Sequence, residues 1–105
     1  DIDLNIHLIK NVPATFVIRV QGKSMTDVGI YDGDLLVVDK SLKPKNFSTV
    51  IANVHDELVV KNFVKEKNEQ FLTSGSKKIE DKITINNDSE IFIWGVVTYV
   101  IHSVY

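Results

Sequence analysis

Short runs of alternating hydrophobic and polar residues, separated by turn-forming residues, fill most of this chain. Between residues 14 and 20, for example, Phe16, Ile18 and Val20 fall on one face of an extended segment, and Thr15 falls on the other. The same kind of pattern predicts strands at residues 14–20, 34–39, 47–54, 58–65, 70–73, 82–85 and 91–104. Because hardly any helix-period pattern reaches ten residues, the sequence predicts one antiparallel all-β domain with at most short helical turns.

Glycine and aspartate mark sharp changes of direction between these strands. Gly22 permits a sharp exit from the first strand, and Asp32-Gly33 is a tight-turn signal before the second. A short helical turn through Asp27 is expected between them. Gly95 lies inside the last predicted strand, where a glycine indicates a bulge or a bend.

Residues 1–13 form an N-terminal segment ahead of the predicted β domain at 14–105. Ile2 and Leu4 alternate like a strand, yet Leu4 and Leu8 also suit a helical turn capped by Asp3, which we favour. The segment lacks the basic start of a signal peptide and an initiator methionine. We therefore expect a processed or trimmed chain.

Composition narrows the classes of function. The 105 residues allow one domain, and 12 basic against 14 acidic residues give a net charge of −2, so direct nucleic-acid binding is not expected. The absence of cysteine excludes disulfides, thiolate zinc sites and cysteine nucleophiles. The longest apolar run, residues 91–105, is shorter than the roughly 20 residues that cross a bilayer, so no membrane anchor is expected.

Ser24 differs from the other six serines, which lie in polar, turn-like surroundings. It follows a predicted buried strand and Gly22, so a turn would hold its hydroxyl and its backbone N–H at a fixed edge of the sheet. The structural alternative is that Ser24 caps the helical turn that follows. The Gly-x-Ser-x-Gly motif of α/β-hydrolases is absent because position 26 is threonine.

The histidines are poor partners for a nucleophilic serine. His7 lies in the ambiguous N-terminal segment, His55 in a hairpin turn and His102 near the end of the chain, so a Ser-His-Asp triad is not indicated. The acidic residues next to His55, and the pair Asp32 and Asp34, have a spacing that is common in exposed turns. The sequence predicts no metal site and no other cofactor.

Lys61 lies inside the predicted strand 58–65, where alternation places it on the face of Val59 and Phe63. Burial between such neighbours disfavours the ammonium and favours the neutral amine, which can act as a base. The structural alternative is a solvent-exposed face on which Lys61 protects an edge strand from pairing. Local sequence leaves both interpretations open.

Three motifs together resemble the LexA/UmuD superfamily of self-cleaving Ser-Lys peptidases, and in particular its UmuD branch. They are Gly22-Lys23-Ser24-Met25, the segment at residues 29–39, and Val59-Val60-Lys61, whose lysine lies 37 residues after the serine. The resemblance spans nearly the whole chain and implies a strongly curved antiparallel β domain of the LexA/signal-peptidase type. It also implies that Ser24 is the nucleophile, that Lys61 is the neutral general base, and that backbone N–H groups of Lys23 and Ser24 form the oxyanion hole.

The resemblance further implies a biological role and partners. In this superfamily a RecA filament on single-stranded DNA promotes cleavage of the protein's own N-terminal arm. The processed UmuD-like homodimer is then the accessory subunit of an error-prone, UmuC-like translesion DNA polymerase in the SOS response, in the cytoplasm. The superfamily cleaves Cys-Gly or Ala-Gly bonds, whereas Ala14 and Ala52 precede Thr15 and Asn53 here, so we expect the arm's cleavage site to be missing from this chain.

Three departures from the superfamily pattern concern the site. Position 59 is often threonine, whose hydroxyl would orient the lysine amine, and Val59 cannot do so. Lys23 replaces an acidic residue of UmuD, and a nearby cation favours an oxyanion. The loop at residues 74–81 is lysine-rich and lacks a proline found thereabouts in UmuD.

Three other functions are compatible with parts of the sequence. The chain could be the C-terminal dimerisation and self-cleavage domain of a LexA-like repressor, which a helix-turn-helix upstream would indicate. A type I signal peptidase shares the Ser-Lys chemistry but needs a membrane anchor. A catalytically silent β domain is the last alternative, and Val59 is the argument for it.

A homodimer is expected from the superfamily, with an interface on the apolar final strand. That strand presents more apolar surface than one small core obviously needs. The interface residues predicted from the sequence are Ile91, Ile93, Val97, Tyr99 and Ile101.

Overall fold

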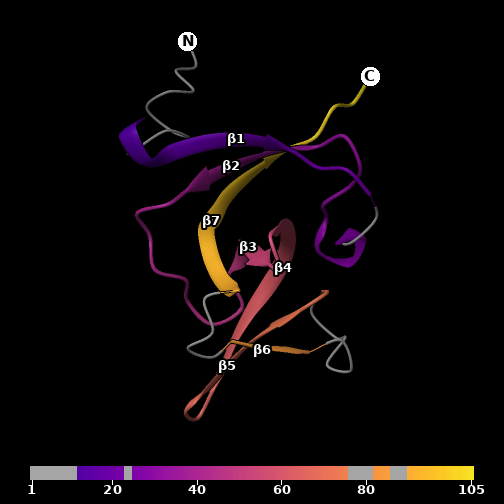
Figure 1. Ribbon diagram of the computed structural model, residues 1–105. Helices are drawn as coiled ribbons and strands as arrows, with labels where there is room; N and C mark the ends of the chain where they lie inside the picture. The colour runs from indigo at the N-terminus through magenta and orange to yellow at the C-terminus, as the bar shows by residue number, and fades with distance from the viewer. Residues whose placement is uncertain (1–11, 23–24, 76–81, 86–89) are drawn as a thin grey trace.

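The computed structural model describes residues 12–22, 25–75, 82–85 and 90–105, which form one antiparallel sheet (Figure 1). Its strands are β1 (Thr15–Arg19), β2 (Leu35–Asp39), β3 (Thr49–Val54), β4 (Glu57–Glu66), β5 (Glu69–Thr73), β6 (Ile83–Ile85) and β7 (Ile91–Ile101). Two 3-10 turns, η1 (Val12–Ala14) and η2 (Thr26–Val28), are the helical elements of these ranges, and neither is long enough to cross a bilayer. The all-β prediction is confirmed, whereas the predicted helical turn near the N-terminus involves residues 1–11, outside the described ranges.

The final strand lies in the interior of the sheet. The strand order is β1-β2-β7-β3-β4-β5-β6, so β7 pairs with β2 on one side and with β3 on the other. Figure 1 shows β7 curving between the β1–β2 pair and the β3–β4 hairpin. The C-terminal strand therefore joins the two halves of the sheet.

Two irregularities interrupt the pairing of β7. The register with β3 passes from Gly95 to Ile93, leaving Trp94 as an extra residue, and the register with β2 passes from Tyr99 to Val97, leaving Thr98. A side chain at position 95 would place its Cβ 2.6 Å from Cγ1 of Val38, so the closely packed strands require glycine there. The bulge expected from Gly95 is confirmed, and such bulges bend and twist a strand.

Two apolar clusters occupy opposite faces of the sheet. Successive residues of β3 divide between them, since Ile51 joins the first cluster while Val50 and Ala52 join the second. The first cluster contains Val20, Met25, Ile30, Leu36, Val38 and Ile51, and the second contains Val50, Ala52, Phe63, Leu72 and Val96. Both clusters are built from strands of the same sheet, so different parts of the sheet pack against one another, which requires the sheet to curve.

Asp34 is a buried carboxylate that ties the C-terminal segment to the turn before β2. Its side chain is 2% exposed, Oδ2 accepts a hydrogen bond from the Tyr31 N–H at 2.9 Å, and Oδ1 lies 2.6 Å from Nδ1 of His102. The His102 ring also packs against Tyr31. The hydrogen bond with His102, followed by that from Tyr31, holds the pKa of Asp34 below its usual value of 3.8.

This carboxylate is expected to make folding sensitive to acid. A group whose pKa is lowered in the folded state adds stability above its unfolded pKa and loses it as the pH falls through the folded pKa. We expect the free energy of unfolding, measured in urea, to differ between the parent and Asp34→Asn by an amount that shrinks as the pH falls below about 4. A difference that stays constant through the acid range would contradict this prediction.

Candidate active site

A cleft of about 420 Å³ separates the end of β1 from the beginning of β4. Residues 18–22 line one side and residues 58–61 line the other, with Ile51 completing the surface. Most of these side chains are apolar, and the two basic ones are Arg19 and Lys61. Arg19 Nη1 donates a hydrogen bond to the Gly33 carbonyl at 3.0 Å, and its guanidinium stays protonated. Lys61 is therefore the basic group of the cleft whose amine is suited to proton transfer.

Lys61 occupies the middle of β4, opposite Val50 of β3. Its side chain is half-buried, and the neighbours on its face, Val59 and Phe63, both pack on the second apolar cluster. The alternation predicted from the sequence agrees with this arrangement. β4 lies between β3 and β5, but the described pairing with β5 begins at Asn62, so the alternative in which Lys61 protects an edge is not decided at this position.

Lys23 and Ser24, predicted to form the oxyanion hole and nucleophile, lie outside the described residues. The residues on either side of them are fixed: Gly22 has φ of 102° and donates its N–H to Asp32 Oδ1 at 2.9 Å, and Met25 is fully buried in the first cluster. The short helical turn expected here is present as η2, with Met25 at its N-cap position and no side-chain cap. The alternative in which the Ser24 hydroxyl caps this turn concerns a residue outside the described ranges.

Ser74 is a partner of Lys61 that the sequence did not predict. The Lys61 Nζ donates a hydrogen bond to the Ser74 Oγ at 2.5 Å, and both groups are partly buried. Residues 67 and 68 alone connect β4 to β5, and the pairing of Asn62 with Thr73 continues to bring position 74 opposite position 61. Counting back from a two-residue hairpin turn was the sequence signal that could have found this contact.

The predicted dimer-interface residues divide into two groups. Ile91, Ile93 and Val97 are half-buried and pack against the apolar clusters of the same chain. Tyr99 and Ile101 are exposed, at 39% and 42%. Three of the five predicted interface residues therefore contribute to the packing of their own chain.

The other polar candidates lie away from the cleft. His55 is in the exposed turn between β3 and β4, with Nδ1 3.1 Å from Oε2 of Glu90, and His102 contacts Asp34. Among the described residues no group of three or more histidine, cysteine, aspartate or glutamate side chains could hold a metal ion. His7 falls in the undescribed N-terminal segment.

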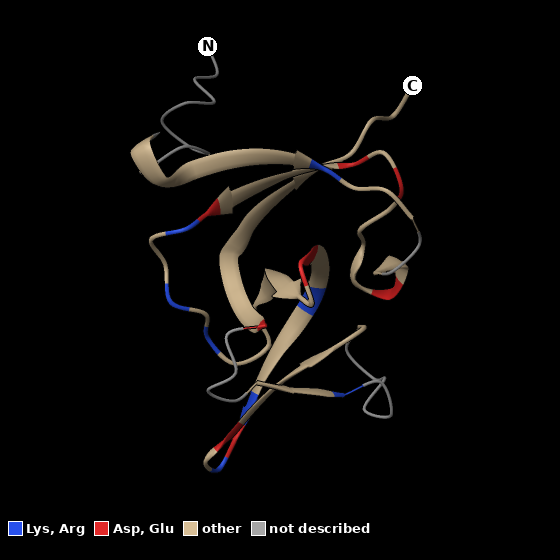
Figure 2. Ribbon diagram, in the orientation of Figure 1, with Lys and Arg blue, Asp and Glu red and all other residues tan. Residues whose placement is uncertain are grey.

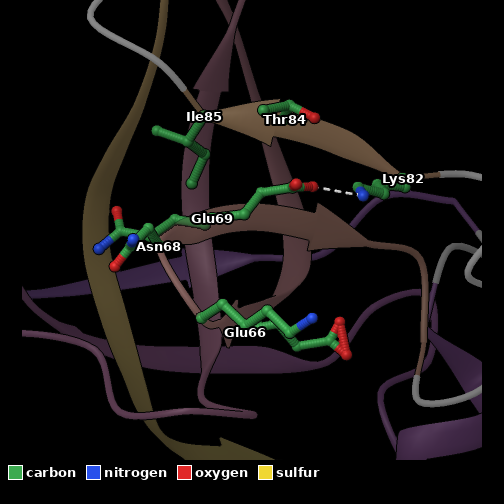
Figure 3. Close-up of a pocket in the computed structure, with 8 residues that line it drawn as sticks. Glu66, Asn68, Glu69, Lys82, Thr84 and Ile85 are labelled. Carbon is green, nitrogen blue, oxygen red and sulfur yellow. Dashed lines mark ion pairs between the residues drawn. The ribbon is translucent and has the colours of Figure 1, made fainter.

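A second hollow lies at the tip of the β4–β5 hairpin, where acidic and basic segments gather in Figure 2. Its volume is about 780 Å³, and its described lining contains no serine. Figure 3 shows Lys82 paired with Glu69, and the Lys82 Nζ also lies 4.5 Å from the centre of the Phe71 ring. With its amine held in this way, Lys82 contributes to joining β6 to β5, and the cleft beside Lys61 remains the better candidate for catalysis.

Comparisons with known proteins agree with the motifs. The Peptidase S24-like family matches residues 1–98. The chain is 37% identical over 99 residues to protein MucA of Salmonella typhimurium, covering 92% of this chain and 67% of MucA, and 38% identical over 103 residues to protein ImpA of Escherichia coli, covering 97% and 68%. It is also 49% identical over 59 residues to the LexA repressor of Shewanella piezotolerans, covering 56% of this chain and 29% of LexA. The chain therefore belongs to the Peptidase S24-like family of self-cleaving serine peptidases, within the LexA/UmuD superfamily that its motifs resemble.

Proposed function

We propose that this chain is the peptidase core of a UmuD-like protein, in which Ser24 is the nucleophile and Lys61 is the general base. The observation that carries the proposal is a half-buried lysine in an apolar cleft whose opposite wall ends at Gly22, two residues before Ser24. Lys61 is the cleft residue whose side chain ends in an amine, the kind of group that can take a proton from a serine hydroxyl.

The proposed reaction moves one proton in each half. The neutral Lys61 amine takes the proton of the Ser24 hydroxyl while Oγ attacks the carbonyl carbon of the peptide bond. Backbone N–H groups of Lys23 and Ser24 stabilise the oxyanion that forms. The Lys61 ammonium then gives its proton to the leaving amine, and water releases the acyl group by the same steps.

The proposed biological role is that of a processed homodimer serving as accessory subunit of an error-prone, UmuC-like translesion polymerase. A RecA filament on single-stranded DNA would promote the cleavage that produces it. The similarity to MucA and ImpA over nearly the whole chain supports this assignment. Of the predicted interface residues, Tyr99 and Ile101 are the exposed ones, and we expect them to lie at the contact with a second copy.

A second candidate is the C-terminal domain of a LexA-like repressor. The observation that favours it is the 49% identity to a LexA repressor, which is higher than the identity to MucA but limited to 59 residues. The nature of the polypeptide released on self-cleavage distinguishes the two candidates.

Labelling by a fluorophosphonate tests the proposed dyad in this chain directly. An activated serine displaces fluoride, forming an Oγ–P bond while the P–F bond breaks and the base takes the proton. We expect intact mass spectrometry to show one adduct per chain and peptide mapping to place it on Ser24, with faster labelling at alkaline pH.

The matched controls are Ser24→Ala, which should remain unlabelled, and Ser48→Ala, which should label like the parent. Ser48 lies in the loop before β3, where its Oγ accepts a hydrogen bond from the Lys45 N–H. An unlabelled parent, or an adduct that persists in Ser24→Ala, would contradict the proposal.

A further inference from the structure

The contact between Lys61 and Ser74 is built into the pairing of two strands. Asn62 of β4 pairs with Thr73 of β5, and the next position on each strand brings Ser74 opposite Lys61. Across this pair the Lys61 Nζ donates to the Ser74 Oγ at 2.5 Å, and both side chains are partly buried. The contact is therefore set by the register of a hairpin that also carries core residues.

The backbone at Ser74 is held on both sides. Thr73 is 3% exposed, and its Oγ1 donates a hydrogen bond to the Gly75 carbonyl at 2.9 Å, closing a tight turn around Ser74. Gly75 has φ of 101°, and an added Cβ there would lie 2.5 Å from the Asp27 carboxylate. The turn that carries Ser74 thus packs against η2, the helical turn that follows Ser24 along the chain.

A lysine amine needs such a contact more than most bases do. It ends a flexible four-carbon stem, so its position costs rotamer entropy to fix. A neutral amine has two N–H bonds and one lone pair, and only the lone pair can accept a proton. An acceptor for one N–H restricts both the rotation of the amine and the direction of its lone pair.

The strand that carries Lys61 supplies no such acceptor at position 59. Val59 lies two residues before Lys61 on the same face and lines the same cleft, but its side chain has no hydroxyl. We propose that Ser74 is the positioning residue of Lys61, orienting its amine toward the cleft by accepting one of its N–H groups. The inference rests on the proposed role of Lys61 as general base.

The fluorophosphonate assay, run over a range of probe concentrations, separates positioning from binding. Ser74→Ala is expected to lower the maximal labelling rate of Ser24 about 10- to 100-fold, because misplacing a catalytic group by about 1 Å has an effect of that order. The probe concentration at half-maximal rate should not change, since Ser74 does not line the cleft. Ser48→Ala serves as the matched control.

Rescue distinguishes positioning from a structural role. Ser74→Thr keeps the hydroxyl and should label at close to the parental rate. Adding Val59→Thr to Ser74→Ala supplies a hydroxyl from the neighbouring position and should recover part of the lost rate. If thermal unfolding shows that Ser74→Ala does not fold, Ser74→Cys replaces it as the test variant. A thiol is similar in size to a hydroxyl but is a weak acceptor, so the same loss of labelling rate is expected.

Three results would overturn the inference, each in a recognisable way. Equal maximal rates in the parent and a folded Ser74→Ala would remove the positioning role and leave the proposed dyad intact. An adduct mapped to Ser74 itself would make this serine a nucleophile instead of a positioning residue. A parent that is never labelled would contradict the proposed function, and the inference with it.

Discussion

Replacement of Lys61 by methionine is expected to leave the protein folded and to lower the labelling rate of Ser24 about 100- to 10,000-fold. General bases contribute factors of about 100 to 10,000, and no histidine among the described residues lines the cleft to take over the proton. Methionine keeps an unbranched apolar stem beside Val59 and Phe63, so the packing of β4 should persist. Intact mass spectrometry measures the rate, and thermal unfolding measures the fold.

The matched control for this substitution is Lys65→Met. Lys65 lies on the same strand and is exposed, paired with Gln70 of β5 outside the cleft. It should label at the parental rate. Parental labelling of a folded Lys61→Met would show that this amine is not the base.

Replacement of Met25 by alanine is expected to lower the free energy of unfolding by about 2–5 kcal/mol. Met25 is fully buried among Ile30, Leu36 and Ile51 in the first apolar cluster, so truncation leaves a cavity there. Its carbonyl also accepts hydrogen bonds from the N–H groups of Val28 and Ile30, which shape the turn after Ser24. Because Met25 adjoins Ser24, slower labelling is expected along with the lost stability.

Urea unfolding provides the measurement, and Met25→Leu provides the control. Leucine nearly conserves the volume, so it should cost less than about 1.5 kcal/mol. If Met25→Ala and Met25→Leu had the same stability, the cluster would not anchor the segment that carries Ser24.

Strand positions could be predicted from the sequence because alternation reports directly which faces are buried. The predicted strands at residues 14–20 and 34–39 correspond to β1 and β2, whose observed ends differ from the predicted ones by one residue at most. The strand order could not be predicted, because β7 pairs with β2 across some sixty residues and with β3 across some forty. Gly95 indicated one bulge of β7, whereas the extra residue at Thr98 has no local signal.

The candidate site was predictable in part for a similar reason. Lys61 could be identified because a lysine between Val59 and Phe63 breaks the apolar face of its strand. Ser74 was harder to identify, because its contact with Lys61 follows from the sequence only if the two-residue turn of the β4–β5 hairpin is placed at Lys67 and Asn68. Lys67 adopts φ of 54° in that turn, a conformation that its residue type does not indicate.

The partial burial of the final strand could not be predicted either, because it also depends on tertiary strand pairing. Ile91, Ile93 and Val97 read as surplus apolar surface in the sequence, but the position of β7 inside the sheet gives them partners in both clusters. Only the tertiary pairing distinguishes these residues from Tyr99 and Ile101, which remain exposed.

Self-cleavage of the full-length gene product, followed by intact mass spectrometry at alkaline pH with and without a RecA filament, tests the central claim most directly. We predict that the parent is cut on the N-terminal side of the β domain, and that Ser24→Ala and Lys61→Ala stay whole. A short released arm would identify a UmuD-like subunit, and a released helix-turn-helix domain would identify a LexA-like repressor. A parent that stays whole even with the filament, or a Lys61→Ala variant that is cut like the parent, would contradict the account.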